Sequence, residues 1–145
     1  MPTRSARTIW TGGLQDGSGR TELVSSGLGT YDVSFPRRSA EAAEGYTSPE
    51  ELIAAAHASC YAMALSGGLG RAGATSIALT VEADVSLGPD PAGGFRISGV
   101  ALRVRGRVEG IDEAAFRAAA DAAKAGCPVS KALTGTEITL DAALD

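Results

Sequence analysis

One apolar run near the middle of the chain constrains the fold more than any other feature. It reads EELIAAAHASCYAMAL over residues 50–65 and lies at a strong helix start. Ser48 suits the N-cap, Pro49 suits the first helical position because its missing N–H costs nothing there, and Glu51 completes a capping box. We expect a helix that runs to about Ser66, ends at the two glycines that follow, and is buried on all sides because nearly every side chain is small or apolar.

Segments bounded by turn residues predict strands on both sides of this helix. The second of two long strands alternates Val100, Leu102 and Val104 with arginines, as expected for a half-buried antiparallel strand with a basic outer face. The short charged segment 37–45 is expected to be a mobile loop. The predicted strands are residues 7–13, 20–26, 30–35, 76–87, 95–108 and 136–144.

Two further helices are predicted near the C-terminus. The first starts after Asp112, a good N-cap, and ends at Gly126, and the second covers VSKAL at residues 129–133. The order is three strands, a helix, two strands, two helices and a strand, which indicates an α+β fold with mostly antiparallel pairing. Because no repeat or linker divides the sequence, residues 1–145 are expected to form one domain.

Charge and hydropathy argue against several classes of partner. The net charge of −4 argues against general affinity for nucleic acid. No apolar stretch approaches the roughly 20 residues that span a bilayer, and the N-terminal MPTRSARTIW has no apolar signal segment. We therefore expect a cytoplasmic protein with no nucleic-acid or membrane partner. The reducing conditions there disfavour a static disulfide and favour a catalytic or redox role for a cysteine pair.

Common metal, phosphate and hydrolase motifs are absent from the sequence. One histidine and two separated cysteines leave too few soft ligands for a zinc site. The glycine-rich pieces SGGLG and DGSG lack the G-K-[ST] ending of a phosphate-binding loop, and no G-x-S-x-G motif marks a hydrolase serine. We therefore expect no bound metal and no resident cofactor.

The two cysteines carry the remaining chemistry. Cys60 lies in the middle of the predicted helix, with His57 one turn earlier at i,i+3 spacing. Such a cysteine is usually inert core, because burial raises the pKa of a thiol; the alternative is a reactive thiol shielded from water. Cys127 precedes Pro128 at a helix start, where N–H groups and the helix dipole favour a thiolate.

A thiolate in an apolar site needs a cation, and an arginine held by a carboxylate is a stable way to supply one. Arg37 and Arg38 are the candidate cations, because they precede the helix start. Glu50 and Glu51 are the candidate acids. Since the capping box already uses Glu51, Glu50 is the freer carboxylate.

The sequences around the two cysteines are distinctive. They read YTSPEELIAAAHASCYAMALS and KAGCPVSKAL, and the chain also contains a W-x-G opening, ADVSL and EITLDAAL. Together these motifs resemble the OsmC/Ohr family of thiol-dependent peroxidases over nearly the whole chain, and His57 and CPVSKAL favour the OsmC branch. The resemblance implies an OsmC-like fold, in which antiparallel sheets wrap around the central helices of an intertwined homodimer.

The resemblance also implies roles for the two cysteines. Cys60 is expected to be the peroxidatic cysteine, whose thiolate attacks an organic hydroperoxide and becomes a sulfenic acid. Cys127 is expected to be the resolving cysteine, which condenses with that sulfenic acid into an intramolecular disulfide. An external dithiol reductant, of the lipoyl type in this family, then restores both thiols.

The resemblance to the family identifies the acid and the cation less directly than the two cysteines. Glu50 matches the family's acid in a T-N-P-E motif, although this chain has Ser48 in place of Asn. The Ohr branch takes its arginine from a G-G-R-D-G segment, where this chain has Leu14. An arginine three residues after an aromatic selects Arg38, and Arg37 remains the alternative.

Distance leaves several arrangements open. Cys60 follows Glu50 by ten positions, about 15 Å of rise in a straight helix, so Arg38 bridges them, the helix bends, or the other subunit supplies the acid.

His57 is expected to orient or pack near the site. An apolar pocket favours alkyl or fatty-acid hydroperoxides as substrates. The alternative function is a non-catalytic redox-sensing or small apolar ligand-binding domain on the same fold.

Overall fold

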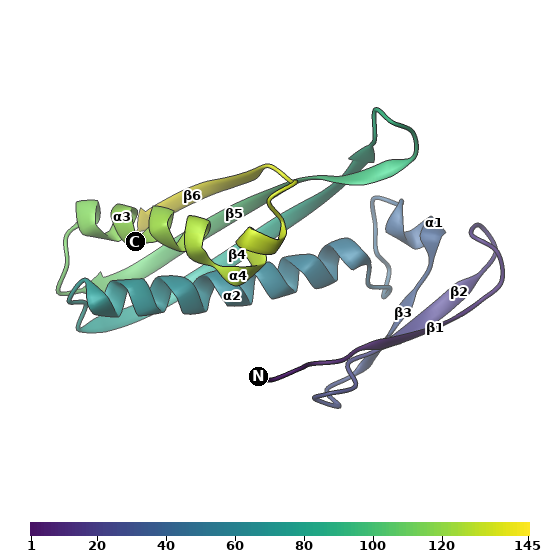
Figure 1. Ribbon diagram of the computed structural model, residues 1–145, viewed down its shortest axis with the longest axis horizontal. Helices are drawn as coiled ribbons and strands as arrows, with labels where there is room; N and C mark the ends of the chain where they lie inside the picture. Colours follow the sequence, from purple (N-terminus) through teal and green to yellow (C-terminus); the bar gives the residue numbers. More distant parts are fainter. The chain divides into compact units, whose positions relative to one another are not determined.

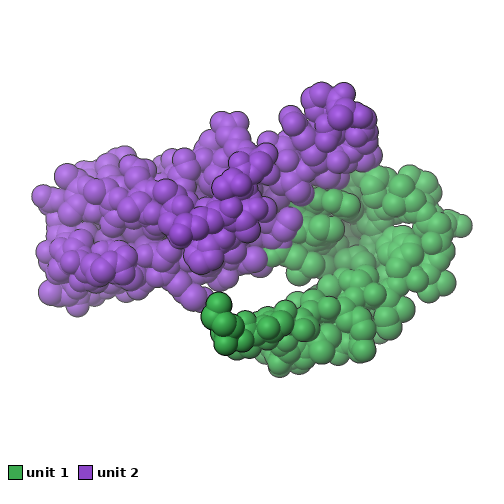
Figure 2. Space-filling view, viewed as in Figure 1, with its two compact units in different colours: residues 1–52 green, residues 53–145 purple.

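The computed structural model describes all 145 residues, which form two compact units, residues 1–52 and residues 53–145 (Figure 2). The boundary lies within helix α2, Pro49–Arg71, so the first turn of this helix belongs to the first unit. Figure 1 shows the order of the elements along the chain. The expectation of a single domain over residues 1–145 stays a prediction.

The first unit is built on an antiparallel sheet in the order β1-β2-β3. Its strands confirm the three predicted ones, although the second begins at Ser18 and ends at Glu22, earlier at both ends than predicted. Part of the predicted mobile loop is helical instead, because the hydroxyl of Ser34 caps the N–H of Arg37 at 3.3 Å. The bounds are β1 Arg7–Thr11, β2 Ser18–Glu22, β3 Thr30–Val33 and α1 Phe35–Arg38.

Helix α2 begins as predicted and ends later than predicted. The N–H of Glu51 donates to the hydroxyl of Ser48 at 3.1 Å, which confirms the N-cap. The predicted stop at Gly67 and Gly68 is wrong, because the helix continues to Arg71. A glycine costs a helix only about 1 kcal/mol, which the packing of buried side chains on either side offsets.

The expectation that α2 is buried on all sides is wrong for the single chain. Four side chains at intervals of four are fully buried and form one stripe, whereas Met63 on another face is 73% exposed. One side of the helix is therefore in the core and another side is uncovered. The buried stripe consists of His57, Tyr61, Leu65 and Leu69.

The length and composition of α2 also correct the hydropathy analysis. Over Pro49–Arg71 the helix is long and apolar enough to cross a membrane by these two measures alone. The core helix of a globular protein passes the same test, and α2 contributes a stripe to such a core. The lack of a membrane partner and the cytoplasmic location stay predictions.

The second unit is a three-stranded sheet with helices packed on one face. The order is β4-β5-β6, with β4 and β5 antiparallel and β6 parallel to β5 (Figure 1). The alternation in β5 is confirmed, because Val100, Leu102 and Val104 are at most 2% exposed. The bounds are β4 Ser76–Pro89, β5 Phe95–Glu109, α3 Glu113–Gly126, α4 Pro128–Ala132 and β6 Ile138–Leu144.

Two arginines on the outer face of β5 are paired with acids on the neighbouring strands. Arg103 donates to Glu82 at 2.7 Å, and Arg105 donates to Asp141 at 2.8 Å. Their positive charges are therefore largely balanced within the sheet, as expected for a solvated face.

Helices α3 and α4 confirm the two predicted C-terminal helices. The side chain of Asp112 caps α3 by accepting from the N–H of Ala115 at 2.8 Å. Phe116 of α3 is fully buried against Gly106 of β5, where a Cβ would lie 3.1 Å from the phenyl ring. Cys127 is the single residue between α3 and α4, so the chain turns at this thiol.

Candidate active site

The two cysteines lie side by side although they are 67 positions apart in the sequence. The sulfur atoms of Cys60 on α2 and Cys127 before α4 share a hydrogen bond of 3.0 Å, and both thiols are free. Cys127 is fully buried and Cys60 is partly exposed. Since a covalent S–S bond is about 2.05 Å long, a movement of about 1 Å would allow the pair to form a disulfide.

The surroundings of the two thiols differ in their effect on ionisation. Burial raises the pKa of Cys60, the hydrogen bond with Cys127 raises it further, and the N–H of Val129 opposes both effects. Burial also disfavours the Cys127 thiolate, yet the pKa of Cys127 is lowered by hydrogen bonds from Cys60 and from the N–H and hydroxyl of Ser130. When the pair shares one proton, the thiolate is therefore favoured on Cys127.

Cys60 needs a nearby positive group to react as a thiolate, and its surroundings do not supply one. The groups that act on its pKa are the buried surroundings, Cys127 and the backbone of Val129, and none of them is a cation. A nucleophilic role for Cys60 therefore requires a further group that stabilises its thiolate.

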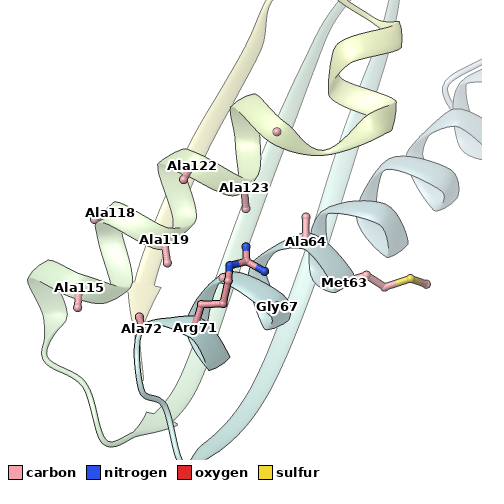
Figure 3. A pocket seen from close by; sticks show the side chains of 12 residues that line it. Met63, Ala64, Gly67, Arg71, Ala72, Ala115, Ala118, Ala119, Ala122 and Ala123 are labelled. Carbon is pink, nitrogen blue, oxygen red and sulfur yellow. The ribbon is translucent and has the colours of Figure 1, made fainter.

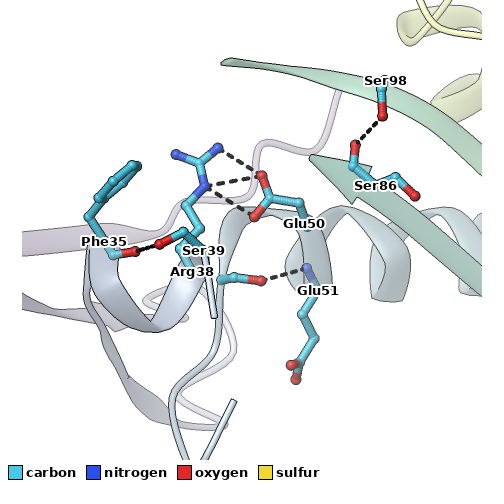
Figure 4. A network of polar contacts seen from close by, with 8 residues as sticks. Phe35, Arg38, Ser39, Glu50, Glu51, Ser86 and Ser98 are labelled. Atoms are coloured by element: carbon cyan, nitrogen blue, oxygen red, sulfur yellow. Dashed lines mark hydrogen bonds and ion pairs between the residues drawn. The ribbon is translucent and has the colours of Figure 1, made fainter. Parts of the chain in front are cut away.

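The predicted arginine and acid form an ion pair in the first unit (Figure 4). The Nε of Arg38 donates to both carboxylate oxygens of Glu50 at 3.1 Å, and its Nη2 donates to Oε1 at 2.7 Å. Glu50 is buried, whereas Arg37, the alternative cation, pairs with Glu44 at 2.5 Å. Glu50 is the carboxylate that holds Arg38, as predicted, whereas the N-cap uses the backbone N–H of Glu51.

A cavity of about 390 Å³ opens beside this ion pair within the first unit. Its walls are mostly apolar, and Arg38 is the single charged residue among them. Such a site can hold an apolar chain while presenting one cation to a polar or anionic end. The apolar residues that line it are Trp10, Leu14, Val33, Phe35, Pro49 and Leu52.

Analysis of the sequence missed one member of the site in the second unit. Ser130 is 5% exposed, and its hydroxyl lies 2.7 Å from Nε2 of the fully buried His57. The spacing could have indicated this pair, because Ser130 follows Cys127 by three positions and His57 precedes Cys60 by three. Two helical residues three positions apart lie on the same face. The His57–Ser130 contact therefore lies one helical turn from the Cys60–Cys127 contact.

A second groove, in residues 53–145, contains none of the predicted site residues. It measures about 560 Å³, runs between α2 and α3, and is lined almost entirely by alanine and glycine (Figure 3). Arg71 and Met63 are its only long side chains. The groove therefore has no nucleophile or acid, and it marks an uncovered small-residue surface.

Comparison with known proteins identifies the family. Residues 42–142 match the family model described as OsmC-like protein. The chain belongs to the OsmC-like family. Peroxiredoxin OsmC of Escherichia coli (strain K12) is 45% identical over 138 residues, which cover 95% of this chain and 94% of that protein. Organic hydroperoxide resistance protein OhrA of Bacillus subtilis (strain 168) is 36% identical over 115 residues, 77% of this chain and 79% of that protein.

A solved structure supports the same assignment. The crystal structure of the organic hydroperoxide resistance protein OhrB of Bacillus subtilis matches with a TM-score of 0.73 and 30% identity. The match covers 96% of this chain and 98% of that one. The predicted membership of the OsmC branch and the α+β OsmC-like fold are therefore confirmed.

Proposed function

We propose that this OsmC-like chain is a cysteine-based peroxidase that reduces organic hydroperoxides. The observation that carries the proposal is the 3.0 Å contact between the sulfur atoms of Cys60 and Cys127. Two relatives support the reaction and the substrate class by their names, peroxiredoxin OsmC and organic hydroperoxide resistance protein OhrA.

The reaction begins at Cys60. Its thiolate attacks one oxygen of the hydroperoxide, so an S–O bond forms, the O–O bond breaks, and the alkoxide leaves and takes up a proton to become an alcohol. The sulfur is thereby oxidised to a sulfenic acid. The Cys127 thiolate then attacks this sulfur, the S–O bond breaks, and the hydroxide leaves as water. An external dithiol, of the lipoyl type, reduces the disulfide by exchange.

Arg38 is the cation that this mechanism requires. The guanidinium stabilises the Cys60 thiolate during attack, while Glu50 holds it in place through three hydrogen bonds. Ten helical positions between Glu50 and Cys60 correspond to a rise of about 15 Å, so we propose that the ion pair of one subunit serves the thiol of its partner. Support for Arg38 over Arg37 comes from the separate pairing of Arg37 with Glu44.

The homodimer is part of the same proposal. Every apolar side chain that is nearly fully buried lies in residues 53–145, and none lies in residues 1–52. Large apolar side chains are instead exposed in the single chain, including Ile9 at 66% and Met63 at 73%. A second copy that covers these surfaces would supply the missing burial.

The substrate class follows from the cavity beside Arg38. Its apolar walls favour an alkyl or fatty-acid hydroperoxide over hydrogen peroxide, which gains nothing from apolar contact. The alternative of a non-catalytic redox sensor or ligand-binding domain predicts oxidation of the cysteines without sustained turnover.

The experiment that tests the proposal is peroxide consumption with dihydrolipoamide as the reductant. We expect the parent chain to consume cumene hydroperoxide through many turnovers and faster than hydrogen peroxide, and Cys60→Ser to be inactive. A serine variant that consumes cumene hydroperoxide at the parent rate would refute the enzyme proposal. One turnover followed by an arrested disulfide would favour the redox sensor.

A further inference from the structure

The His57–Ser130 pair lies one helical turn from the two thiols and has no role in the mechanism above. The Nε2 of His57 and the hydroxyl of Ser130 are 2.7 Å apart, and both side chains are buried. This polar pair bridges α2 and α4, the same two segments that the cysteines bridge. A buried polar pair beside a redox-active pair requires an explanation, because apolar residues would fill the same space at lower cost.

The surroundings of His57 determine its protonation and tautomer. Burial lowers the pKa of His57, so the ring is neutral. Its Nδ1 is buried and has no hydrogen-bond partner. An unpaired buried N–H is rarer in proteins than an unpaired acceptor, so the proton belongs on Nε2 and Nδ1 carries the lone pair. His57 therefore donates to the hydroxyl oxygen of Ser130.

This direction leaves the hydrogen of the Ser130 hydroxyl free for a second partner. Ser130 follows Cys127 by three positions at the start of α4. Burial raises the pKa of Cys127, and the hydroxyl and N–H of Ser130 are among the groups that lower it. A hydroxyl that accepts from an imidazole becomes a stronger donor, because successive hydrogen bonds polarise one another. His57 and Ser130 therefore form a short chain of donors one helical turn from the sulfur of Cys127.

We propose that His57 and Ser130 are positioning residues for the resolving step, holding Cys127 as a thiolate aimed at the sulfur of Cys60. The proposal rests on the peroxidase function. In this step the Cys127 thiolate forms the S–S bond, the S–O bond of the Cys60 sulfenic acid breaks, and the hydroxide leaves. The proton that Cys127 released when it ionised is returned to this hydroxide as water. His57 and Ser130 donate hydrogen bonds throughout and transfer no proton.

The pair is therefore expected to affect the second chemical step and leave the first one unchanged. Rapid-quench experiments with cumene hydroperoxide can follow sulfenic acid by dimedone trapping and disulfide by mass spectrometry. In Ser130→Ala we expect sulfenic acid to form at the parent rate and the disulfide to form about 10-fold more slowly. This factor corresponds to the loss of one hydrogen bond to a charged group.

Conservative variants separate positioning from folding. Ser130→Thr keeps the hydroxyl, and His57→Gln keeps an N–H near the Nε2 position, so both should form the disulfide within about 3-fold of the parent rate. His57→Leu loses the donor and should behave like Ser130→Ala. Ser59→Ala is the matched control, because the Ser59 hydroxyl bonds only to helix carbonyls. Equal slowing of both steps in Ser130→Ala, or no slowing of either step, would overturn the proposal.

A second measurement needs no peroxide and is therefore independent of the proposed function. In a Cys60→Ser background, the thiolate absorbance near 240 nm reports the ionisation of Cys127. We expect Ser130→Ala to move the midpoint of this titration to higher pH and Ser59→Ala to leave it in place. Besides position 60, Tyr61 of α2 is a titratable group that interacts with Cys127, and burial raises its pKa, so it stays neutral in this titration. Burial lowers the pKa of His57, so the partner of Ser130 is neutral as well. An unchanged midpoint in Ser130→Ala would refute the role of the donor chain.

Discussion

The two units of this chain differ in how much of their apolar surface is buried. In residues 53–145 the side chains of α2, β5 and α3 form a continuous core, and the cysteine pair belongs to it. In residues 1–52 no apolar side chain is nearly fully buried, and Leu14 and Leu28 are 59% and 80% exposed. The first unit nevertheless contains the Arg38–Glu50 ion pair and the apolar cavity.

This difference in burial indicates that the two units have different roles in the proposed chemistry. A reaction between two sulfur atoms depends on a fixed separation, which packed helices maintain better than exposed strands. Substrate binding and charge stabilisation depend less on a fixed separation. A less well-packed unit, such as residues 1–52, can therefore provide them, provided that a second copy covers it. The exposed apolar residues of the first unit therefore argue for a second copy of the chain.

The largest effect is expected at the thiol pair. Cys60→Ser should reduce peroxide consumption by at least about 1,000-fold, because it removes the nucleophile. Cys127→Ser should still form sulfenic acid in a single turnover and then fail to form the intramolecular disulfide. Stopped-flow measurement of peroxide loss, with mass spectrometry of the product, checks both variants. Full turnover in Cys127→Ser with a dithiol would exclude the resolving role.

The next effect concerns the core of the second unit. Phe116 is fully buried, so Phe116→Ala should lower the free energy of unfolding by about 3–5 kcal/mol through the lost packing and the cavity that remains. Leu28→Ala in the first unit should change it by less than about 0.5 kcal/mol at protein concentrations that leave the chain monomeric, as for other exposed positions. Urea unfolding measures both values. A loss above about 2 kcal/mol in Leu28→Ala under the same monomeric conditions would contradict the contrast between the two units.

Most of the fold was predictable from the sequence because local patterns agree with the tertiary structure. The alternation in β5 and the Asp112 and Ser48 caps each specify an element by local chemistry, and the structure contains all of them. The end of α2 was not predictable in this way. Glycine at Gly67 and Gly68 signals a stop locally, but packing of the residues around them overrides the signal.

The candidate site was predictable in parts. The motifs identified both cysteines, and the structure brings their sulfur atoms together. Glu50 pairs with an arginine as predicted, although Glu51 contributes its backbone N–H to the N-cap and its carboxylate lies away from it. Ser130 was missed because a serine in a short helix has no distinctive chemistry until the fold places it against His57. The burial of α2 was overestimated because composition does not reveal which face a single chain leaves uncovered.

The ion pair of the first unit provides the third test. Arg38→Ala should slow the reaction of Cys60 with peroxide by about 100-fold, the usual loss when one donor that stabilises developing charge is removed. Arg37→Ala is the matched control, because it removes a neighbouring arginine that pairs with Glu44 instead. It should retain the parent rate. Sulfenic acid formation in a single turnover is the measurement. Equal losses in both variants would assign the effect to general charge and would refute a specific role for Arg38.

The smallest expected effect concerns substrate preference. Leu14 lines the cavity beside Arg38, so Leu14→Ala removes apolar surface that a long substrate would bury. The KM for linoleic acid hydroperoxide should rise about 10-fold, whereas the KM for the short tert-butyl hydroperoxide should change by less than about 2-fold. Leu28→Ala is the matched leucine outside the cavity and should leave both KM values unchanged. Steady-state kinetics of the two substrates decide the point. If Leu14→Ala alters neither KM, the cavity does not hold the hydroperoxide chain, and the first unit would contribute charge without contributing substrate recognition.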